Sequence, residues 1–159
     1  MRICASTPSG EVDSIARAMA RSEKRFRVDE ANATVPRLQL LMERLQRAAL
    51  RLHEEMQRLA EETGGSLARV TTDDLLRHRP AARELVAEVE AVVQAIEESG
   101  AVLKDIQLGL VDFPAELDGE AIYLCWQFGE PEIGFWHAVG EGFAGRQPLP
   151  GRTRLRYLQ

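Results

Sequence analysis

GAVLKDIQLGLVDFPAELDGEAIYLCWQFGEPEIGFWHAVGEGFAGRQPL, residues 100–149, is the most informative part of the chain. Eight of the nine aromatic residues of the chain lie beyond position 112, and nine of its twelve glycines lie at or beyond position 100. Aromatic rings bring a large apolar area to a core, and glycines permit tight turns. The stretch therefore predicts a small β-sheet, whereas the chain before it has the pattern of helices.

Four strands are expected in this stretch, at residues 101–106, 109–113, 120–128 and 133–139. Asp118-Gly119 between apolar runs is a hairpin signal, and Pro114 indicates a bend before it. A turn that pairs Phe128 with Ile133 would place Trp126 opposite Phe135 and Leu124 opposite His137. In this register Cys125 and His137 lie on opposite faces of the sheet. The expected sheet is an antiparallel meander of three or four strands.

Residues 26–62 form the strongest helical pattern. Apolar residues recur there at spacings of three and four: Leu38, Leu41, Leu45, Ala48, Leu52, Met56 and Leu59. Asp29 and Glu30 suit the first turn, where the helix dipole favours negative charge. Pro36 indicates either a kink or a helix start nearby, and the pair of glycines at 64–65 ends the helix.

A second helix is expected at residues 81–99, after a connection at 66–80 that holds at most one short helical turn. Its apolar seam consists of Leu85, Val89, Val92 and Ile96. The first helix would span on the order of 50 Å and the second about 28 Å. Because part of the longer seam would stay uncovered in such a pair, we expect the sheet or a second copy of the chain to bury it.

The predicted fold is therefore α+β, with a long, coiled-coil-like N-terminal helical hairpin followed by the small meander. The chain of 159 residues is the size of one domain. We divide it into a flexible extension at 1–25, which contains a short helical patch, a hairpin at 26–99, a β lobe at 100–149 and a basic tail at 150–159.

Composition argues against several classes of partner. The net charge is -5, with 25 acidic and 20 basic side chains, so nucleic acid is an unlikely partner. No apolar run approaches the roughly 18 residues of a membrane span, and the first residues lack the apolar core of a signal peptide. Cys4 and Cys125 fit neither a disulfide framework nor a paired-cysteine metal motif. The expected location is the cytoplasm.

The segments FRVDEANATVPRL and LKDIQLGLVDFPAELDGEAIYLCWQFGEPEIGFWHAVGEGFAGRQPL resemble a prokaryotic family catalogued as domain of unknown function 2203. The resemblance covers about residues 26–149 and implies no particular activity. The positions that match the family pattern are Asn32, Pro36, Asp105, Gly109, Asp112, Trp126, Glu130, His137, Gly142 and Arg146. Arg27 departs from it, because members tend to carry there a hydroxyl residue that would cap the first helix.

A carboxylate and histidine cluster is the first candidate site. Asp105, Asp112, Glu130 and His137 all lie in the sheet region, and an aspartate inside a strand needs a donor or a cation. Asp112, Glu130 and His137 are the candidate ligands of a divalent metal such as iron, manganese or zinc. The alternative is structural: Asp112 would bond turn amides or Lys104, and His137 would be a packed histidine.

Three further candidates stay open. The loop GEGFAGR with Arg146 could hold a phosphate or carboxylate, or could simply let the chain turn. Cys125 could be a nucleophile with His137 as its base, although the expected register separates them. The rings of Trp126, Phe128, Phe135 and Trp136 could form a floor for a ligand or a partner, with Trp136 as the candidate ligand contact, or could be the core of the sheet against the helices.

Two functions are compatible with these observations. The first is a non-enzymatic, cytoplasmic scaffold or interaction protein that forms a homo-oligomer through the first helix and binds a protein partner. The alternative is a small metal- or ligand-binding protein, possibly an enzyme, with its site among Asp105, Asp112, Glu130, Trp136, His137 and Arg146. The lack of a catalytic motif favours a protein that is not an enzyme without deciding the matter.

Overall fold

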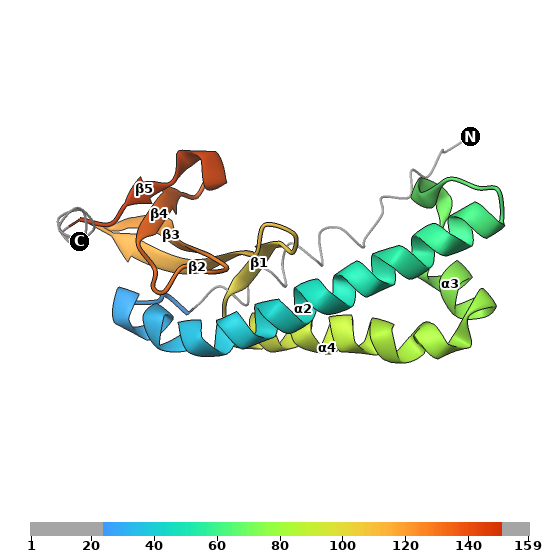
Figure 1. The fold of residues 1–159 in the computed structure, drawn as a ribbon. Coiled ribbons are helices and arrows are strands. Elements are labelled where there is room, and N and C mark those ends of the chain that lie inside the picture. The colour runs from blue at the N-terminus through green and yellow to red at the C-terminus, as the bar shows by residue number, and fades with distance from the viewer. Residues whose placement is uncertain (1–23, 151–159) are drawn as a thin grey trace, which may run out of the picture.

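The computed structural model describes residues 24–150, and within them three α-helices precede one antiparallel sheet of five strands (Figure 1). The helices are α2 (Val28–Glu62), α3 (Thr72–His78) and α4 (Arg83–Glu98). The strands are β1 (Val102–Asp105), β2 (Leu110–Leu117), β3 (Glu120–Gln127), β4 (Phe135–Ala138) and β5 (Gln147–Pro148), in that order across the sheet. Three short 3-10 helices are η1 (Leu67–Arg69), η2 (Pro80–Ala82) and η3 (Phe143–Gly145). The predicted α+β class is confirmed, and the two-residue strand β5 adds to the three or four strands expected.

Helix α2 begins well before Pro36 and continues through it, so of the two alternatives predicted at this proline, a helix start nearby is wrong. Glu30 stabilises the N-terminus, because its carboxylate accepts the Arg27 N–H at 3.0 Å. Asp29 and Glu30 occupy the first turn, as predicted. The chain leaves the helix through Gly64, whose φ of 66° is a backbone conformation that favours glycine.

Helices α2 and α4 lie side by side and run antiparallel, and the sheet lies over the N-terminal part of α2 (Figure 1). Their contact is apolar inside and charged at its edge, where Arg44 pairs with Glu88 at 2.8 Å. Val92 and Ile96 of α4 share one buried cluster with residues of α2 and of the sheet. The predicted helical hairpin is thus present, and its first half is covered by the sheet.

The connection between the long helices contains more helix than predicted. It forms η1 and the seven-residue helix α3, whereas at most one turn was expected. The start of α3 is a capping box: the Thr71 hydroxyl accepts the Asp74 N–H at 3.1 Å, and the Asp74 carboxylate accepts the Thr71 N–H at 3.0 Å. This reciprocal pair explains why so short a segment is helical.

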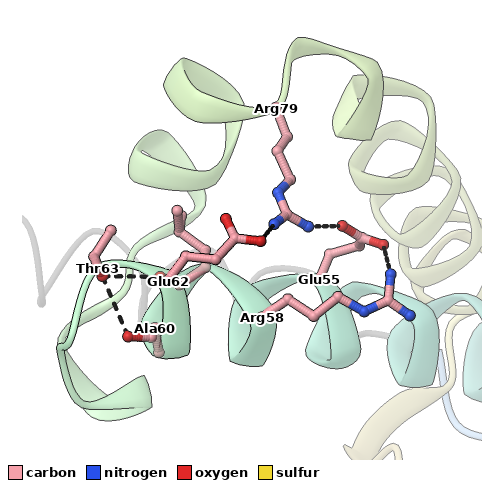
Figure 2. Close-up of polar contacts among 7 residues, drawn as sticks. Glu55, Arg58, Ala60, Glu62, Thr63 and Arg79 are labelled. Carbon is pink, nitrogen blue, oxygen red and sulfur yellow. Dashed lines mark hydrogen bonds and ion pairs between the residues drawn. The ribbon is translucent and has the colours of Figure 1, made fainter.

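Helix α3 folds back on the far end of α2 and covers it. Leu75 is fully buried against Leu59 and Ala82 in a second, smaller cluster. Beside this cluster Arg79 bridges two carboxylates of α2, Glu55 at 2.5 Å and Glu62 at 2.6 Å (Figure 2). The end of the α2 seam is therefore buried within one chain.

The hairpin between β2 and β3 turns at Asp118 and Gly119, as predicted, with φ of 51° and 83°. Strand β2 nevertheless continues through Pro114, where only a bend was expected. Pro114 has no N–H to donate, but β1 ends its pairing at Asp112, so no neighbouring strand needs that donor. The Pro114 carbonyl instead accepts the N–H of Phe26 at 2.7 Å.

The pairing of β3 with β4 differs by one residue from the predicted register. Leu124 lies opposite Trp136, and Tyr123 lies opposite His137. The connection is a wide loop rather than a tight turn, because its buried Ile133 is tied to α2 by an N–H that donates to the Asn32 side chain at 2.7 Å. A slip of one residue exchanges the two faces of a strand.

The two faces of the sheet therefore differ in character. The face toward the helices is apolar, with Val111, Phe113, Ala115, Ile122, Leu124 and Trp126 in the main core. The opposite face carries Asp112 and Cys125, which are directly paired, together with His137. The buried polar residues of the β lobe thus lie on the side of the sheet away from the helices.

The predicted extension, apart from residues 24–25, and the basic tail, apart from residue 150, lie outside the described residues. Among the helices of residues 24–150, none is both long and apolar enough to cross a membrane.

Candidate metal centre

Asp112, Cys125 and His137 meet on three adjacent strands, β2, β3 and β4. One carboxylate oxygen, the thiol sulfur and one imidazole nitrogen all lie within 4.8 Å of one another. All three residues are buried, with exposed fractions of 3%, 2% and 2%. In the part of the chain that the structure describes, this is the one group of histidine, cysteine and acidic side chains with such spacing.

The backbone fixes the orientation of the His137 ring. Its Nδ1 lies 2.9 Å from the carbonyl oxygen of Ala138, and its Nε2 lies 3.0 Å from Asp112 Oδ2. A carbonyl oxygen only accepts, so Nδ1 carries a hydrogen and donates it. In the neutral ring Nε2 then presents a lone pair to the carboxylate. Two acceptors at this distance attract each other only when a proton or a metal ion lies between them.

The Cys125 thiol belongs to the same cluster and is a poor nucleophile. Burial, followed by the nearby charge of Asp112, raises the pKa of the thiol from 9.0 to about 12. The thiol also hydrogen-bonds to the Asp112 carboxylate. Cys125 and His137 share one face, so the predicted separation was wrong. However, both nitrogens of His137 already have other partners, and the negative charge of the neighbouring Asp112 carboxylate disfavours a thiolate at Cys125.

Lys104 and Tyr123 border the cluster. The Nζ atom of Lys104 lies 3.9 Å from Asp112 Oδ2 and 5.1 Å from the centroid of the Tyr123 ring. The Tyr123 ring lies 5.5 Å from that of His137, at an angle of 37°. The lysine ammonium is therefore held between a carboxylate and an aromatic face, at the edge of the buried group.

A cavity of about 120 Å³ opens beside the cluster. Asp112, Cys125 and His137 all line it, together with Lys104 and the loop after β4, which contributes Glu141 and Phe143. Its volume is enough for several water molecules. A ligand in this cavity would contact the three buried side chains directly.

Glu130 and Arg146 form a separate pair. Arg146 Nη2 donates to both carboxylate oxygens of Glu130, at 2.8 and 2.9 Å, and the guanidinium lies over the rings of Phe135 and Phe143. Glu130 also accepts the N–H of Gln127 at 2.8 Å. The pair ties the β3–β4 loop to the residue that precedes β5. The carboxylate of Glu130 is thus bonded to Arg146, whereas Asp112 and His137 are bonded to each other. The structure does not bring Glu130 together with the other two predicted ligands.

The remaining candidates lie elsewhere. Asp105 Oδ1 accepts the Leu108 N–H at 2.8 Å and so closes the turn after β1. Trp136 pairs with Leu124 and packs against the main core on the helix side of the sheet. Trp126 is fully buried in that core, and Phe128 packs against it, so these rings do not form an open floor.

A model of the family described as "Uncharacterized conserved protein (DUF2203)" matches residues 24–149. The chain belongs to this family. No curated protein and no solved structure matches the chain. The DUF2203 match extends over the whole of the cluster and its cavity, including the loop that contributes Glu141 and Phe143.

In this DUF2203 chain, the sequence analysis predicted Asp112 and His137 as metal ligands, but it did not include Cys125 among them. The signal that could have found it is the alternation along two strands, because Asp112 and Cys125 are directly opposite in the β2–β3 pair. The tight Asp118-Gly119 turn fixes this pairing, and its register could have been counted outward from the turn.

Proposed function

We propose that the protein binds a divalent transition-metal ion, zinc in the first instance, through Asp112, Cys125 and His137. The observation that carries this proposal is the convergence of a carboxylate oxygen, a thiol sulfur and an imidazole nitrogen within 4.8 Å in a buried site. These are the three donor types that zinc uses in proteins. This set contains Asp112 and His137 of the predicted ligands and replaces Glu130 with Cys125.

The His137 ring supports the assignment. Metal-bound histidines commonly donate their second ring N–H to a carbonyl or carboxylate, which fixes the tautomer and directs the other nitrogen at the metal. The hydrogen bond of 2.9 Å to the Ala138 carbonyl supplies this arrangement, and Nε2 points toward Asp112.

Charge also favours a divalent ion. A buried charge is costly unless it is paired, and a carboxylate with a thiolate brings two negative charges into one buried site. A divalent cation neutralises both and displaces the thiol proton of Cys125. The site is then neutral, with His137 as its uncharged ligand.

The distances require small movements. Ligand atoms around a tetrahedral zinc, each about 2.0 to 2.3 Å from the metal, lie roughly 3.3 to 3.8 Å apart. The separation of 3.0 Å between Nε2 and Oδ2 is slightly shorter, and the limit of 4.8 Å for the group is longer. We expect rotations of the Asp112 and Cys125 side chains to bridge these differences.

Zinc content tests the proposal. The native mass of the zinc-treated protein, after dialysis against a weak chelator, should exceed the denatured mass by one zinc ion per chain. His137→Gln, Asp112→Asn and Cys125→Ser should each weaken zinc binding by 10-fold or more, because three ligands leave little redundancy. Loss of the thiolate-to-metal absorption of the cobalt form in Cys125→Ser would identify the sulfur as a ligand.

Matched variants separate the site from adventitious binding. His53→Gln, Asp105→Asn and Cys4→Ser change the same residue types elsewhere in the chain and should leave the zinc content unchanged. Circular dichroism shows whether the site variants keep their fold. Stoichiometric zinc in a folded His137→Gln variant, or no retained zinc in the unaltered chain, would overturn the proposal.

Self-association through α2, with a scaffold role in the cytoplasm and a further protein partner, is the second candidate. Leu40 and Leu50 of this helix favour it, because their exposed fractions are 65% and 59%. Self-association was first suggested by the apolar seam of α2, part of which was expected to stay uncovered. In the structure this seam is buried within the chain at Leu45 and Leu59. We rank this function below metal binding, since two exposed leucines are a weaker signal than a buried ligand set.

A further inference from the structure

Lys104 places a positive charge on the wall of the cavity beside the proposed metal centre. Its Nζ atom lies 3.9 Å from Asp112 Oδ2, and its side chain is 44% exposed, so the ammonium faces solvent at the edge of the site. The ring of Tyr123, with its centroid 5.1 Å from Nζ, holds the lysine in place on one side. The ammonium therefore lies next to a proposed metal ligand.

A bound metal would leave this lysine without its counter-charge. The charge of the Asp112 carboxylate, together with that of the Cys125 thiolate, would be neutralised by the divalent ion. The other charged side chain on the cavity wall is Glu141, in the loop after β4. On the β1 side of the cavity the Lys104 ammonium would then keep a positive charge that the Asp112 carboxylate no longer balances.

Three protein ligands also leave a tetrahedral ion with one open position, which is the arrangement of catalytic rather than structural zinc sites. The three proposed ligands line the cavity of about 120 Å³, so an ion held by them would be accessible to a ligand from this space. The remaining walls include the apolar side chains of Leu110, Val139 and Phe143. Such a space suits a small ligand with one charged end.

We propose that this position takes a small oxyanion, a carboxylate or phosphate group, with one oxygen on the metal and another on the Lys104 ammonium. The inference rests on the proposed metal binding and adds the class of ligand to it. A divalent ion and an ammonium a few ångströms apart form a two-point contact for such a group. The volume of the cavity limits the ligand to a small molecule or to the end of a longer one.

The test uses the full chain loaded with cobalt, whose visible absorption reports on its coordination. Acetate and inorganic phosphate are titrated separately at constant ionic strength, in a buffer free of other coordinating anions. A saturable change of the visible bands with at least one of the two is expected, and comparison of the two titrations tells carboxylate from phosphate.

Lys104 is tested by two substitutions and a matched control. Lys104→Met keeps the aliphatic chain and removes the charge, so the dissociation constant of the anion should rise by about 10-fold or more. Lys104→Arg should restore most of the affinity. Lys24→Met changes the other lysine of the sequence, which lies over the Phe26 ring, and should have no effect.

The outcomes separate the two proposals. A chain that binds no cobalt overturns metal binding and the anion site together. Cobalt bound with visible bands that neither anion changes overturns the anion site alone. Equal anion affinity in the unaltered chain and in Lys104→Met overturns the role of the lysine.

Discussion

Cys125 shows at the scale of one residue how burial determines chemistry. Its sulfur is buried beside Asp112, and burial, followed by the charge of that carboxylate, raises the pKa of the thiol to about 12. A cysteine next to a histidine suggests a nucleophile, but a protonated thiol that donates to a carboxylate is not reactive. The same thiol becomes a ligand once a metal ion replaces its proton.

The rate of alkylation tests whether the Cys125 thiol is buried and protonated. In a metal-free Cys4→Ser variant, Cys125 is the single cysteine, and iodoacetamide at pH 8 should modify it at least about 100-fold more slowly than in the unfolded chain. The reason is that a thiol pKa raised from 9.0 to about 12 lowers the thiolate fraction at this pH, and burial restricts access as well. Mass spectrometry follows the reaction. Equal rates in the folded and unfolded chain would contradict the buried placement of the sulfur.

At the scale of elements, the sequence predicted what periodicity and turn chemistry determine. The leucine spacing of α2 and the Asp118-Gly119 turn gave one long helix and one hairpin, and both are present. The register of β4 was not predictable in this way, because the Ile133 N–H is held by Asn32, about 100 positions away in the chain. Local pattern contains no information about such a contact, and the predicted register, one residue away from the observed one, placed His137 on the face opposite Cys125.

The length of helix α3 was also underestimated, because the stability of this short helix depends on its capping box. Asp74 is central to it, and the pKa of its carboxyl is lowered by hydrogen bonds from Thr71. A carboxyl with a lowered pKa in the folded state stabilises the fold above its unfolded pKa. This contribution is lost as pH falls through the lower, folded value.

The pH dependence of α3 tests this account. We expect α3 to lose helicity as pH falls from about 4, near the ordinary aspartate value, toward 2. The Cα chemical shifts of Leu75 and Leu76 report it. Asp74→Asn should remove most of this pH dependence. Asp73→Asn is the matched control, because Asp73 lies in the same first turn, and this variant should retain the pH dependence of the unaltered chain. An unchanged titration in Asp74→Asn would show that the cap does not control the helix.

At the scale of the whole molecule, α2 connects two hydrophobic clusters of unequal size. Its first half contributes Leu38, Met42 and Leu45 to the main core under the sheet, and its far end contributes Leu59 to the small cluster with α3. The proposed metal centre lies on the outer face of that sheet, supported by the main core. Stability therefore need not be uniform along the molecule, and the α3 end should open first.

Hydrogen exchange can show this division. Leu75→Ala removes the fully buried centre of the small cluster, at a cost of about 2 to 4 kcal/mol. If the two clusters unfold separately, amide exchange should accelerate in residues 55–82 and stay unchanged in β2, β3 and β4, and zinc affinity should stay unchanged too. Phe113→Ala is the counterpart in the main core, where it should accelerate exchange throughout the sheet and weaken zinc binding. Faster exchange of the strands in Leu75→Ala would mean instead that α2 transmits unfolding along its whole length, so that the molecule unfolds as one cooperative unit and the metal centre depends on both clusters.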